Sequence, residues 1–575
     1  MKKLFIAVIC LSVQFLCFTY AQSPAQNERI ERETRAVWLT TNFRLDWPPP
    51  VFDEDVQKNE LIKILDNIKE KNLNTVYFQV RSNGTLFYNS EIEPFTPYLT
   101  GTTGKMTSYD PLEFAVKEAH KRGLEIHAWI NVNRCFAGKD EFIMSHPKHV
   151  TNLHPELIVK SNNEGAVSYW LDPGLPSTKD YLVSIIEELV TNYKIDGVQF
   201  DFIRYPGNDF NDEQSYKMYG RGLDKNNWRR ENISNIVKDL SKAAKQINPI
   251  IKMGAAPFGI YTNIKGAVGS ESYLSVYQDS RKWINEKFLD YIVPQIYWDI
   301  NSNPRFDSLA VNWRKNIHER NLILGVAAYK DEVKDELEDI IKLSRKIGAE
   351  GVSFFRYQNI ADYNFKSYEK FAFPAAMKWI DELRPQAPQN LTFQFVNDTQ
   401  IKLKWNQPDV SLNNNGIGYY TLYRLNNINS AITPNNFFEI IEADKTSVTL
   451  DFAKPNFVKY FFTLTSVDKL WNESLQYSNV VEITLPKLSK LAKELKHFDK
   501  PVLFKDINDH YKILLYSSAE EDINILAGDK EKQILIQKAK LLHGENIISV
   551  EEDLSKYSFL KIKFVSGKRE EILQM

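Results

Sequence analysis

Cysteine is scarce in this chain, with only three among 575 residues. Cys10 and Cys17 lie within the first 21 residues, so Cys135 is the only cysteine in the remainder. A single thiol cannot form an internal disulfide. We therefore expect hydrophobic cores alone to hold the fold together.

The chain also lacks an excess of charge of either sign, because its formal net charge is -2. This balance gives no long-range attraction to phosphate backbones, so nucleic acid is not an expected partner. No HExxH motif, close His/Cys cluster, GxSxG elbow or P-loop occurs, which leaves metal binding, acyl transfer and phosphoryl transfer without a motif. We predict no metal and no cofactor, and the sequence does not indicate an oligomeric state.

The N-terminus has the three zones of a secretory signal. Two lysines precede an apolar run from Leu4 to Tyr20, and Ala21 comes before a polar segment. We predict a signal peptide at residues 1–21 and a mature protein in the periplasm, at the cell surface or in the medium. The alternative is a retained membrane anchor, although the apolar run only approaches the length of a bilayer span. After cleavage we expect no stable membrane insertion.

Short apolar runs alternate with amphipathic segments eight times in residues 33–384. This alternation predicts an α/β protein with a (β/α)₈ TIM-type barrel, and an open doubly wound sheet is the competing fold. The runs are TRAVWLTT from Thr34, TVYFQVR from Thr75, EIHAWINVN from Glu125, GVQFDFI from Gly197, IKMGAA from Ile251, IVPQIYW from Ile292, LILGVAAY from Leu322 and GVSFFRY from Gly351.

The helical periodicity stops at RPQAPQN, which begins at Arg384. Strand-like runs then predict a β-sandwich at residues 388–486, in which Trp405 and Tyr460 resemble the fibronectin type III pattern. Residues 500–575 again show short strands and are predicted to form a small β-domain. On these boundaries, a barrel that ends near Arg384 should fold and be active alone.

Alternation along each strand separates the residues that face the barrel axis from those that face the helices. In GVQFDFI the apolar residues Val198 and Phe200 suit the helix side, so Gln199 and Asp201 point inward. The inward polar residues fall near the C-terminal ends of the strands, where barrel enzymes build active sites. Asp201 is therefore the first catalytic candidate. The same test assigns to substrate binding Gln79, Arg81, Trp129, Asn131, Asn133, Gln199, Gln295 and Tyr297.

Structural alternatives remain open for several of these residues. Asp201 could be a buried carboxylate paired with Arg81 or with Arg204, which is also assigned to substrate binding. His127 has inward parity but lies deeper, where a satisfied core histidine is the favoured interpretation. Trp129 and Trp298 could stack on sugar rings or pack in the core.

Glycoside hydrolysis usually needs two carboxyl groups, one of which protonates the leaving oxygen while the other attacks or activates water. Asp201 is the first. For the second, Asp299 ranks highest because it has inward parity just past the sixth strand. Glu93, in the loop after the second strand, ranks next, and Asp172, in the loop after the third strand, ranks last and is also assigned to substrate binding.

These residues lie within segments that resemble the bacterial glycosyl-hydrolase-10-like family from about Glu33 to Trp379. The resemblance implies a secreted or surface (β/α)₈ glycosidase that cleaves peptidoglycan glycan strands stripped of their stem peptides, with Asp201 at the position of the family's strand-four aspartate. The segments, in order, are FQVRSNGTLFYNSEIEPFTPYLTG, YDPLEFAVKEAHKRGLEIHAWINVNR, YWLDPG, DGVQFDFIRYP, APFGIYTN and VPQIYW.

The chain departs from this family at a few positions. Thr85 and Phe202 stand where the family often has Asp, and the run from Asn131 to Arg134 replaces Asn-Pro-Tyr-Arg. The strand-four segment also resembles chitinase-like barrels, except that Ile203 occupies the place of their acid Glu. If the substrate carries an N-acetyl group, Asp201 could orient that group as an internal nucleophile.

Three hypotheses follow for the function. The first is a hydrolase of cell-wall glycan strands, the second a hydrolase of another polysaccharide, and the third a glycan-binding barrel without catalysis. Activity on purified glycans separates the first two from the third, and a comparison of substrates separates the first from the second.

Overall fold

The computed structural model describes residues 29–162, 167–397, 400–409, 415–452, 459–484, 501–505, 510–517, 519–528, 532–542, 544–567 and 569–574. The predicted signal peptide lies outside these residues. Among the helices in the described ranges, none combines the length and apolar character needed to cross a bilayer.

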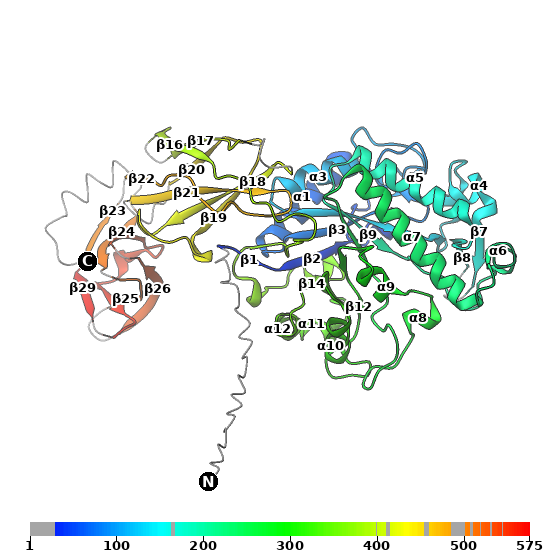
Figure 1. Ribbon diagram of the computed structural model, residues 1–575. Coiled ribbons are helices and arrows are strands. Elements are labelled where there is room, and N and C mark those ends of the chain that lie inside the picture. The colour runs from blue at the N-terminus through cyan, green and yellow to red at the C-terminus, as the bar shows by residue number, and fades with distance from the viewer. Residues whose placement is uncertain are drawn as a thin grey trace, which may run out of the picture.

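Eight parallel strand positions close into a barrel (Figure 1). The strands are β2 (Thr34–Leu39), β3 (Thr75–Ser82), β5 (Glu125–Asn131), β9 (Gly197–Asp201), β10 (Lys252–Ala255), β11 (Tyr291–Ile292) with β12 (Gln295–Ile296), β13 (Asn321–Val326) and β14 (Gly351–Phe354). Each pairs with the next, and β14 pairs back with β2, which confirms the predicted (β/α)₈ fold. The sixth position is divided at Pro294, which cannot donate a ladder hydrogen bond.

Helices cover the outside of this barrel, and three of the long ones begin at an aspartate cap. The carboxylates of Asp53, Asp110 and Asp224 accept N–H groups of the first turns of α1, α3 and α7. The helices are α1 (Glu54–Glu70), α2 (Pro97–Thr100), α3 (Pro111–His120), α4 (Val150–Leu153), α5 (Pro176–Asn192), α6 (Glu213–Tyr219), α7 (Lys225–Ile247), α8 (Ser272–Ser275), α9 (Ser280–Asn285), α10 (Phe306–Asn316), α11 (Asp331–Lys334), α12 (Leu337–Ile347) and α13 (Tyr357–Ile360).

Short strands elaborate the barrel loops. In the loop after β5, a three-stranded antiparallel sheet forms from β6 (Arg134–Ala137), β8 (Ser168–Leu171) and β7 (Ile158–Ser161). β4 (Thr85–Leu86) pairs with β3, and β1 (Glu31–Arg32) pairs with β15 (Ala372–Phe373). The last pair joins the two ends of the barrel segment.

Two glycines make room for rings inside the barrel. A Cβ on Gly254 would overlap the ring of Tyr291, and a Cβ on Gly197 would lie 2.6 Å from Nδ1 of His127. His127 Nδ1 and the Tyr291 hydroxyl are 2.7 Å apart. His127 is thus a bonded core residue deep in the barrel, as its position in the sequence indicates.

Gly254→Ala should lower the free energy of unfolding by about 3 kcal/mol or more, because overpacking an enclosed site costs ~1–3 kcal/mol even where neighbours can adjust. Urea unfolding measures the effect. The double variant Gly254→Ala/Tyr291→Leu should recover part of the loss by removing the overlapping ring. Wild-type stability in Gly254→Ala would contradict this account of the interior.

Two antiparallel sheets follow the barrel, with the strand orders β16-β17-β20 and β19-β18-β21-β22. They enclose one apolar core that includes Trp405 and Tyr460, whereas the fibronectin type III assignment and its boundaries stay predictions. The strands are β16 (Gln389–Phe395), β17 (Gln400–Asn406), β18 (Ile417–Leu425), β19 (Phe437–Glu442), β20 (Ser447–Asp451), β21 (Lys459–Asp468) and β22 (Val481–Thr484).

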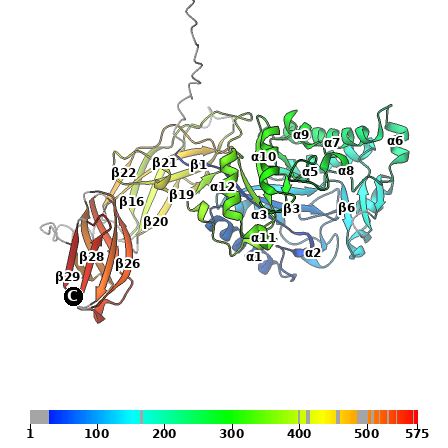
Figure 2. The same ribbon diagram turned by 90° about the horizontal axis from the view of Figure 1, so that it is seen from below.

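The C-terminal region forms two more antiparallel sheets around a separate core, ordered β23-β24-β27 and β26-β25-β28-β29. Figure 2 shows these sheets beyond the β16–β22 sheets and away from the barrel. The strands are β23 (Val502–Lys505), β24 (Tyr511–Ser517), β25 (Glu521–Gly528), β26 (Gln533–Leu541), β27 (Gly544–Ser549), β28 (Phe559–Phe564) and β29 (Glu570–Gln574).

The β16–β22 sheets pack on the barrel through an apolar core of their own. Phe371 and Phe437 stack with ring centroids 4.3 Å apart, and Phe373 lies 5.3 Å from Trp471. Ile30, before the first barrel strand, belongs to the same buried cluster. Segments before and after the barrel therefore both contact these sheets.

Candidate active site

Asp201 is the last residue of β9 and lies at the C-terminal end of the barrel strands. The chain turns at once, because Phe202 has a left-handed φ of 48°. The Asp201 carboxylate accepts the Phe202 N–H at 2.7 Å and the amide of Gln295 at 3.3 Å. It is partly exposed, so a ligand in the barrel mouth can reach it.

Burial raises the pKa of Asp201 above its ordinary value. The Phe202 N–H, the charges of Arg134 and Arg204 and the indole of Trp129 lower it, but the loss of solvent outweighs them. A raised pKa favours the protonated form of a carboxyl group, the form that general acid catalysis needs.

The rate should therefore fall as the pH rises through this raised pKa, since only the protonated form of Asp201 can donate. Arg134→Gln removes a charge that lowers the pKa, so the alkaline limb of kcat/KM should move to higher pH. Arg221→Gln, at an exposed position, serves as the control. A limb that stays in place or moves to lower pH in Arg134→Gln would refute the coupling.

Asn131 and Gln199 are buried beside Asp201, on β5 and β9. Asn131 pairs with Asp201 in the sheet register, and Gln199 accepts the Trp38 indole N–H at 2.6 Å. Asn131 Nδ2 and Gln199 Nε2 have no hydrogen-bond partner within the described part of the chain. Two amide groups beside Asp201 can therefore still donate a hydrogen bond to water or to a ligand.

Gln79 and Trp129 contact other parts of the protein interior. Gln79 accepts the N–H groups of Thr41 and Asn42 at 3.1 and 2.9 Å, so it holds the loop after β2. Trp129 is buried in the axial apolar cluster, with its indole beside Asp201. Both residues are therefore buried beneath the site and are not exposed to solvent.

Two arginines flank Asp201 on the side of β6 and β8. The Arg134 guanidinium lies 3.4 Å from the Phe202 ring centroid. Arg204 is buried and lies 5.0 Å from the rings of Phe202 and Trp170. Asn133 donates to the carbonyl of Arg204 at 3.2 Å, which holds the turn after β9. Arg81 pairs with Glu93. The Arg204 charge lowers the pKa of Asp201, so the alternative that these two residues are paired stays open.

Glu93 is fully enclosed. Its two oxygens accept Arg81 Nε and Nη2 at 2.7 and 2.6 Å, and the Tyr181 hydroxyl donates to one of them at 2.7 Å. The Arg81 charge holds the pKa of Glu93 below its usual value despite burial. The carboxylate is buried and is not accessible from the mouth.

Asp299 caps a turn. Its carboxylate accepts the N–H groups of Asn301 and Ser302 at 2.8 and 2.6 Å, and bonds to Ser302 hold its pKa below the usual value. A lowered pKa favours the ionised carboxylate, the form that acts as a base or nucleophile, over the protonated form that acts as an acid. The bonds direct the carboxylate into its own loop, and its predicted pairing with Asp201 stays a prediction.

Asp172 lies under the loop after β8. It accepts the Gly174 N–H at 2.8 Å, and burial raises its pKa, with Ser215 among its partners. Ser215 belongs to α6, outside the set of strand ends around Asp201. The partners of Asp172 thus lie in its own loop and on α6, and its assignment to catalysis or substrate binding stays a prediction.

An aromatic wall stands beside Asp201. Burial raises the pKa of Tyr297, and the nearby Asp201 charge adds to this effect. The Tyr297 ring lies 5.7 Å from that of Phe355. Tyr329, which is 47% exposed, lies 6.1 Å from Phe355. Trp298 instead packs against the helix-side core. Phe355 and Tyr329 were missed by the sequence reasoning, although the inward parity of GVSFFRY, applied to the last strand, could have found Phe355.

Within the described residues, no group of three or more His, Cys, Asp or Glu side chains is arranged to hold a metal ion. The chemistry of the mouth is that of a carboxyl group with a raised pKa, amides, arginines and rings. This set can bind hydroxyl-rich ligands and transfer a proton to a leaving oxygen.

Comparison with known proteins identifies the family. The family model described as glycosyl hydrolase-like 10 matches residues 33–339, a range that contains Asp201 and the barrel strands β2 to β13. The chain belongs to the glycosyl hydrolase-like 10 family. It is accordingly an enzyme of the glycoside hydrolase class with a carbohydrate substrate.

Two relatives extend this result. Glycosyl hydrolase YngK of Bacillus subtilis (strain 168) is 31% identical over 82% of this chain and 96% of its own length. Glycosyl hydrolase DigH of Escherichia coli (strain K12) is 34% identical over 54% of this chain and 76% of its own length. A solved endo-beta-1,4-mannanase from Thermotoga petrophila is 9% identical over 80% of this chain and 98% of its own, with a TM-score of 0.38, too distant to bear on the substrate.

Proposed function

We propose that this glycosyl hydrolase-like 10 enzyme is exported and hydrolyses glycosidic bonds in bacterial cell-wall glycan strands that have lost their stem peptides. The observation that carries the proposal is Asp201, a partly exposed carboxyl group with a raised pKa at the mouth of the barrel. The family resemblance of the surrounding segments supports the choice of glycan. The signal-like N-terminus supports export.

Asp201 acts first as a general acid in this proposal. Its proton passes to the glycosidic oxygen as the bond to the anomeric carbon breaks, and the resulting carboxylate then accepts a proton from the attacking water. Arg134 and Arg204 stabilise that carboxylate between the two steps. Tyr297 and Phe355 offer apolar faces to the sugar rings.

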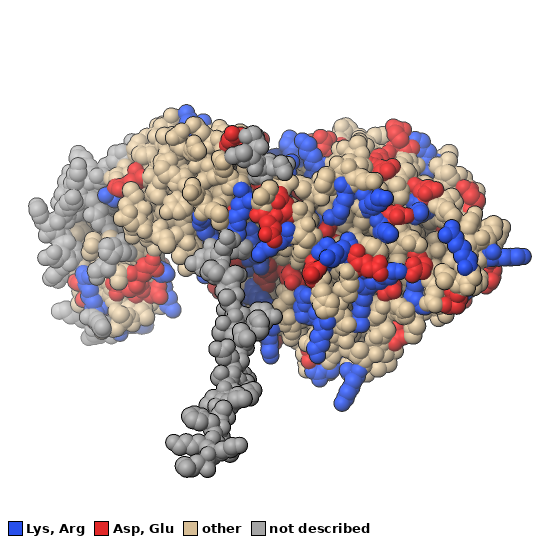
Figure 3. Space-filling view, in the orientation of Figure 1, with Lys and Arg blue, Asp and Glu red and all other residues tan. Residues whose placement is uncertain are grey.

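The surface of the barrel agrees with a substrate of low charge density. In Figure 3 the Lys and Arg side chains are interspersed with Asp and Glu over the barrel, without a large area of one sign on that face. Recognition of this substrate therefore depends on hydrogen bonds and ring faces in the mouth more than on long-range attraction.

The test is a digestion of purified peptide-free glycan strands, intact peptidoglycan, chitin and mannan by the mature protein, followed by mass spectrometry and reducing-end analysis. We expect soluble fragments from the peptide-free strands above all, and none with Asp201→Asn. Cleavage of chitin or mannan in preference would move the assignment to another polysaccharide. The anomeric configuration of the first product shows whether a second group attacks the sugar directly.

A further inference from the structure

The buried ion pair of Arg81 and Glu93 lies directly behind the site. Both side chains are about 1% exposed, and both oxygens of Glu93 are engaged by Arg81 and Tyr181. A sugar in the mouth cannot reach a carboxylate that is enclosed in this way. The pair therefore needs an explanation other than direct catalysis or substrate binding.

The hydrogen bonds of the third guanidinium nitrogen, Arg81 Nη1, suggest a positioning role. Arg81 Nη1 donates to the carbonyl oxygens of Asn131 and Val132, the latter at 3.0 Å. Asn131 is the last residue of β5 and Val132 follows it, where the chain leaves the barrel. A guanidinium fixed by a bidentate carboxylate holds such carbonyls in one place, because its donors are coplanar and rigid.

The end of β5 in turn holds Asp201. The Val132 N–H donates to the Asp201 carbonyl at 2.8 Å, and the Asn133 N–H donates to the Phe202 carbonyl at 3.2 Å. These bonds continue the β5–β9 pairing past the end of both strands, across the left-handed turn at Phe202. The backbone that carries the acid is thus supported by the same residues that Arg81 holds.

We propose that Arg81 is a positioning residue for Asp201, with Glu93 as its fixed counter-ion. The inference rests on the proposed acid role of Asp201 and assigns to Arg81 and Glu93 a role different from substrate binding or proton transfer. Arg81 fixes the position of the backbone at the end of β5. This backbone in turn fixes the position of the Asp201 carboxyl group relative to the glycosidic oxygen. A displacement of about 1 Å in such a group costs up to ~10²-fold in rate.

The test replaces the pair by apolar side chains of similar size in the full-length protein. Arg81→Met alone leaves a buried charge and should lower the Tm strongly. The triple variant Arg81→Met/Glu93→Leu/Tyr181→Phe removes every group that depended on the carboxylate, so its Tm should return to within a few degrees of wild type. Its kcat should stay about 10- to 100-fold low, with KM within about threefold.

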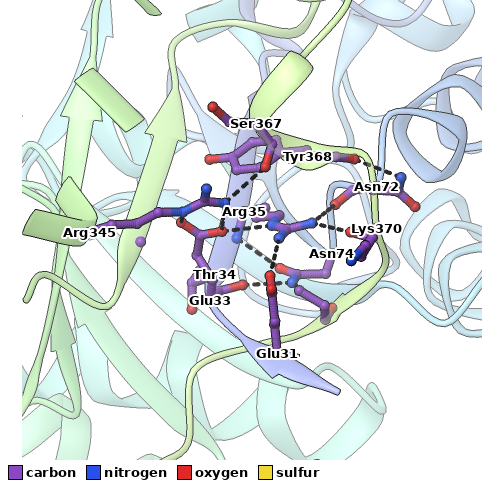
Figure 4. A network of polar contacts seen from close by, with 12 residues as sticks. Glu31, Glu33, Thr34, Arg35, Asn72, Asn74, Arg345, Ser367, Tyr368 and Lys370 are labelled. Carbon is purple, nitrogen blue, oxygen red and sulfur yellow. Dashed lines mark hydrogen bonds and ion pairs between the residues drawn. The ribbon is translucent and has the colours of Figure 1, made fainter. Parts of the chain in front are cut away.

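A matched control exists at the opposite end of the barrel. Figure 4 shows Arg35 of β2 facing Glu33, with its guanidinium also directed at the carbonyl of Lys370. Arg35 is likewise about 1% exposed. Arg35→Met/Glu33→Leu should therefore change the Tm without changing the kcat of the folded enzyme, because no residue of the mouth depends on it.

Wild-type kcat in the stable triple variant would overturn the inference, as would an equal loss of kcat in the Arg35 control. Glu93→Gln gives a separate check: the acid limb of kcat/KM should stay as in wild type, whereas its disappearance would make Glu93 catalytic. If the wild-type enzyme cleaves no glycan, the proposed function fails instead. The positioning role is then decided by crystal structures, in which the triple variant must show a displaced Asp201 carboxyl group.

Discussion

Asp201→Asn should lower kcat on glycan strands by about 10² to 10⁴, the usual contribution of a general acid–base group. The substitution keeps the size of the side chain and can keep the hydrogen bond from the Phe202 N–H. It removes the proton that the leaving oxygen needs. Glycan binding should change much less, because the rings of Tyr297 and Phe355 and the amide of Gln295 remain.

The same variant should be more stable than wild type at neutral pH. Burial raises the pKa of Asp201, so ionising this group costs stability, and that cost grows as the pH rises from the unfolded pKa through the folded one. Asparagine has no such cost. The Tm difference between the variant and wild type should therefore shrink at low pH.

Turnover and Tm measured on the same preparations separate catalysis from structure. Asp299→Asn and Glu93→Gln are the companion variants, and the prediction that Asp299 is the second carboxylate requires the first of them to lose turnover as Asp201→Asn does. A stable and fully active Asp201→Asn enzyme would end the catalytic assignment. A loss of stability with normal turnover of the folded fraction would favour a structural carboxylate.

A barrel cut after Arg384 should be much less stable than the full chain, and aggregation of that fragment is the expected result. The cut uncovers Phe371, Phe373 and Ile30, whose partners lie on the β16–β22 sheets. Burying one such side chain contributes about 1.5–3 kcal/mol, so the sum approaches the ~5–15 kcal/mol of a whole domain. This expected result is opposite to the prediction from sequence that a barrel ending near Arg384 is active alone, and the fragment decides between the two.

Two further chains make this comparison specific. A chain that ends at Thr484 keeps both sheets of the β16–β22 unit and should keep the Tm and turnover of the full protein, since the C-terminal sheets have a separate core. Trp471→Ala in the full chain should lower the Tm by opening the same interface. A soluble, active fragment ending at Arg384 would show that the interface is dispensable.

Much of the fold was readable from the sequence because two periodicities alternate in it. The apolar run at Gly197 and the helical segment before it predict β9 and α5 in their places, and the parity of Asp201 predicts its position at the strand end. Pro294 explains a detail that parity alone does not give, the division of the sixth strand. For the candidate site, parity predicts which way a side chain points but not which residues it contacts.

What the sequence determined by itself is the barrel, the strand-end place of Asp201 and the family, because alternation and residue order are local properties. The tertiary structure alone decided which carboxylates are accessible. Glu93 meets Arg81 and Tyr181 across β3 and α5, and Asp299 meets the N–H groups of its own turn. The tertiary structure also decided the contact of Phe371 with Phe437. Such pairings depend on distances between segments far apart in the chain, and a pattern along the sequence carries no measure of those distances.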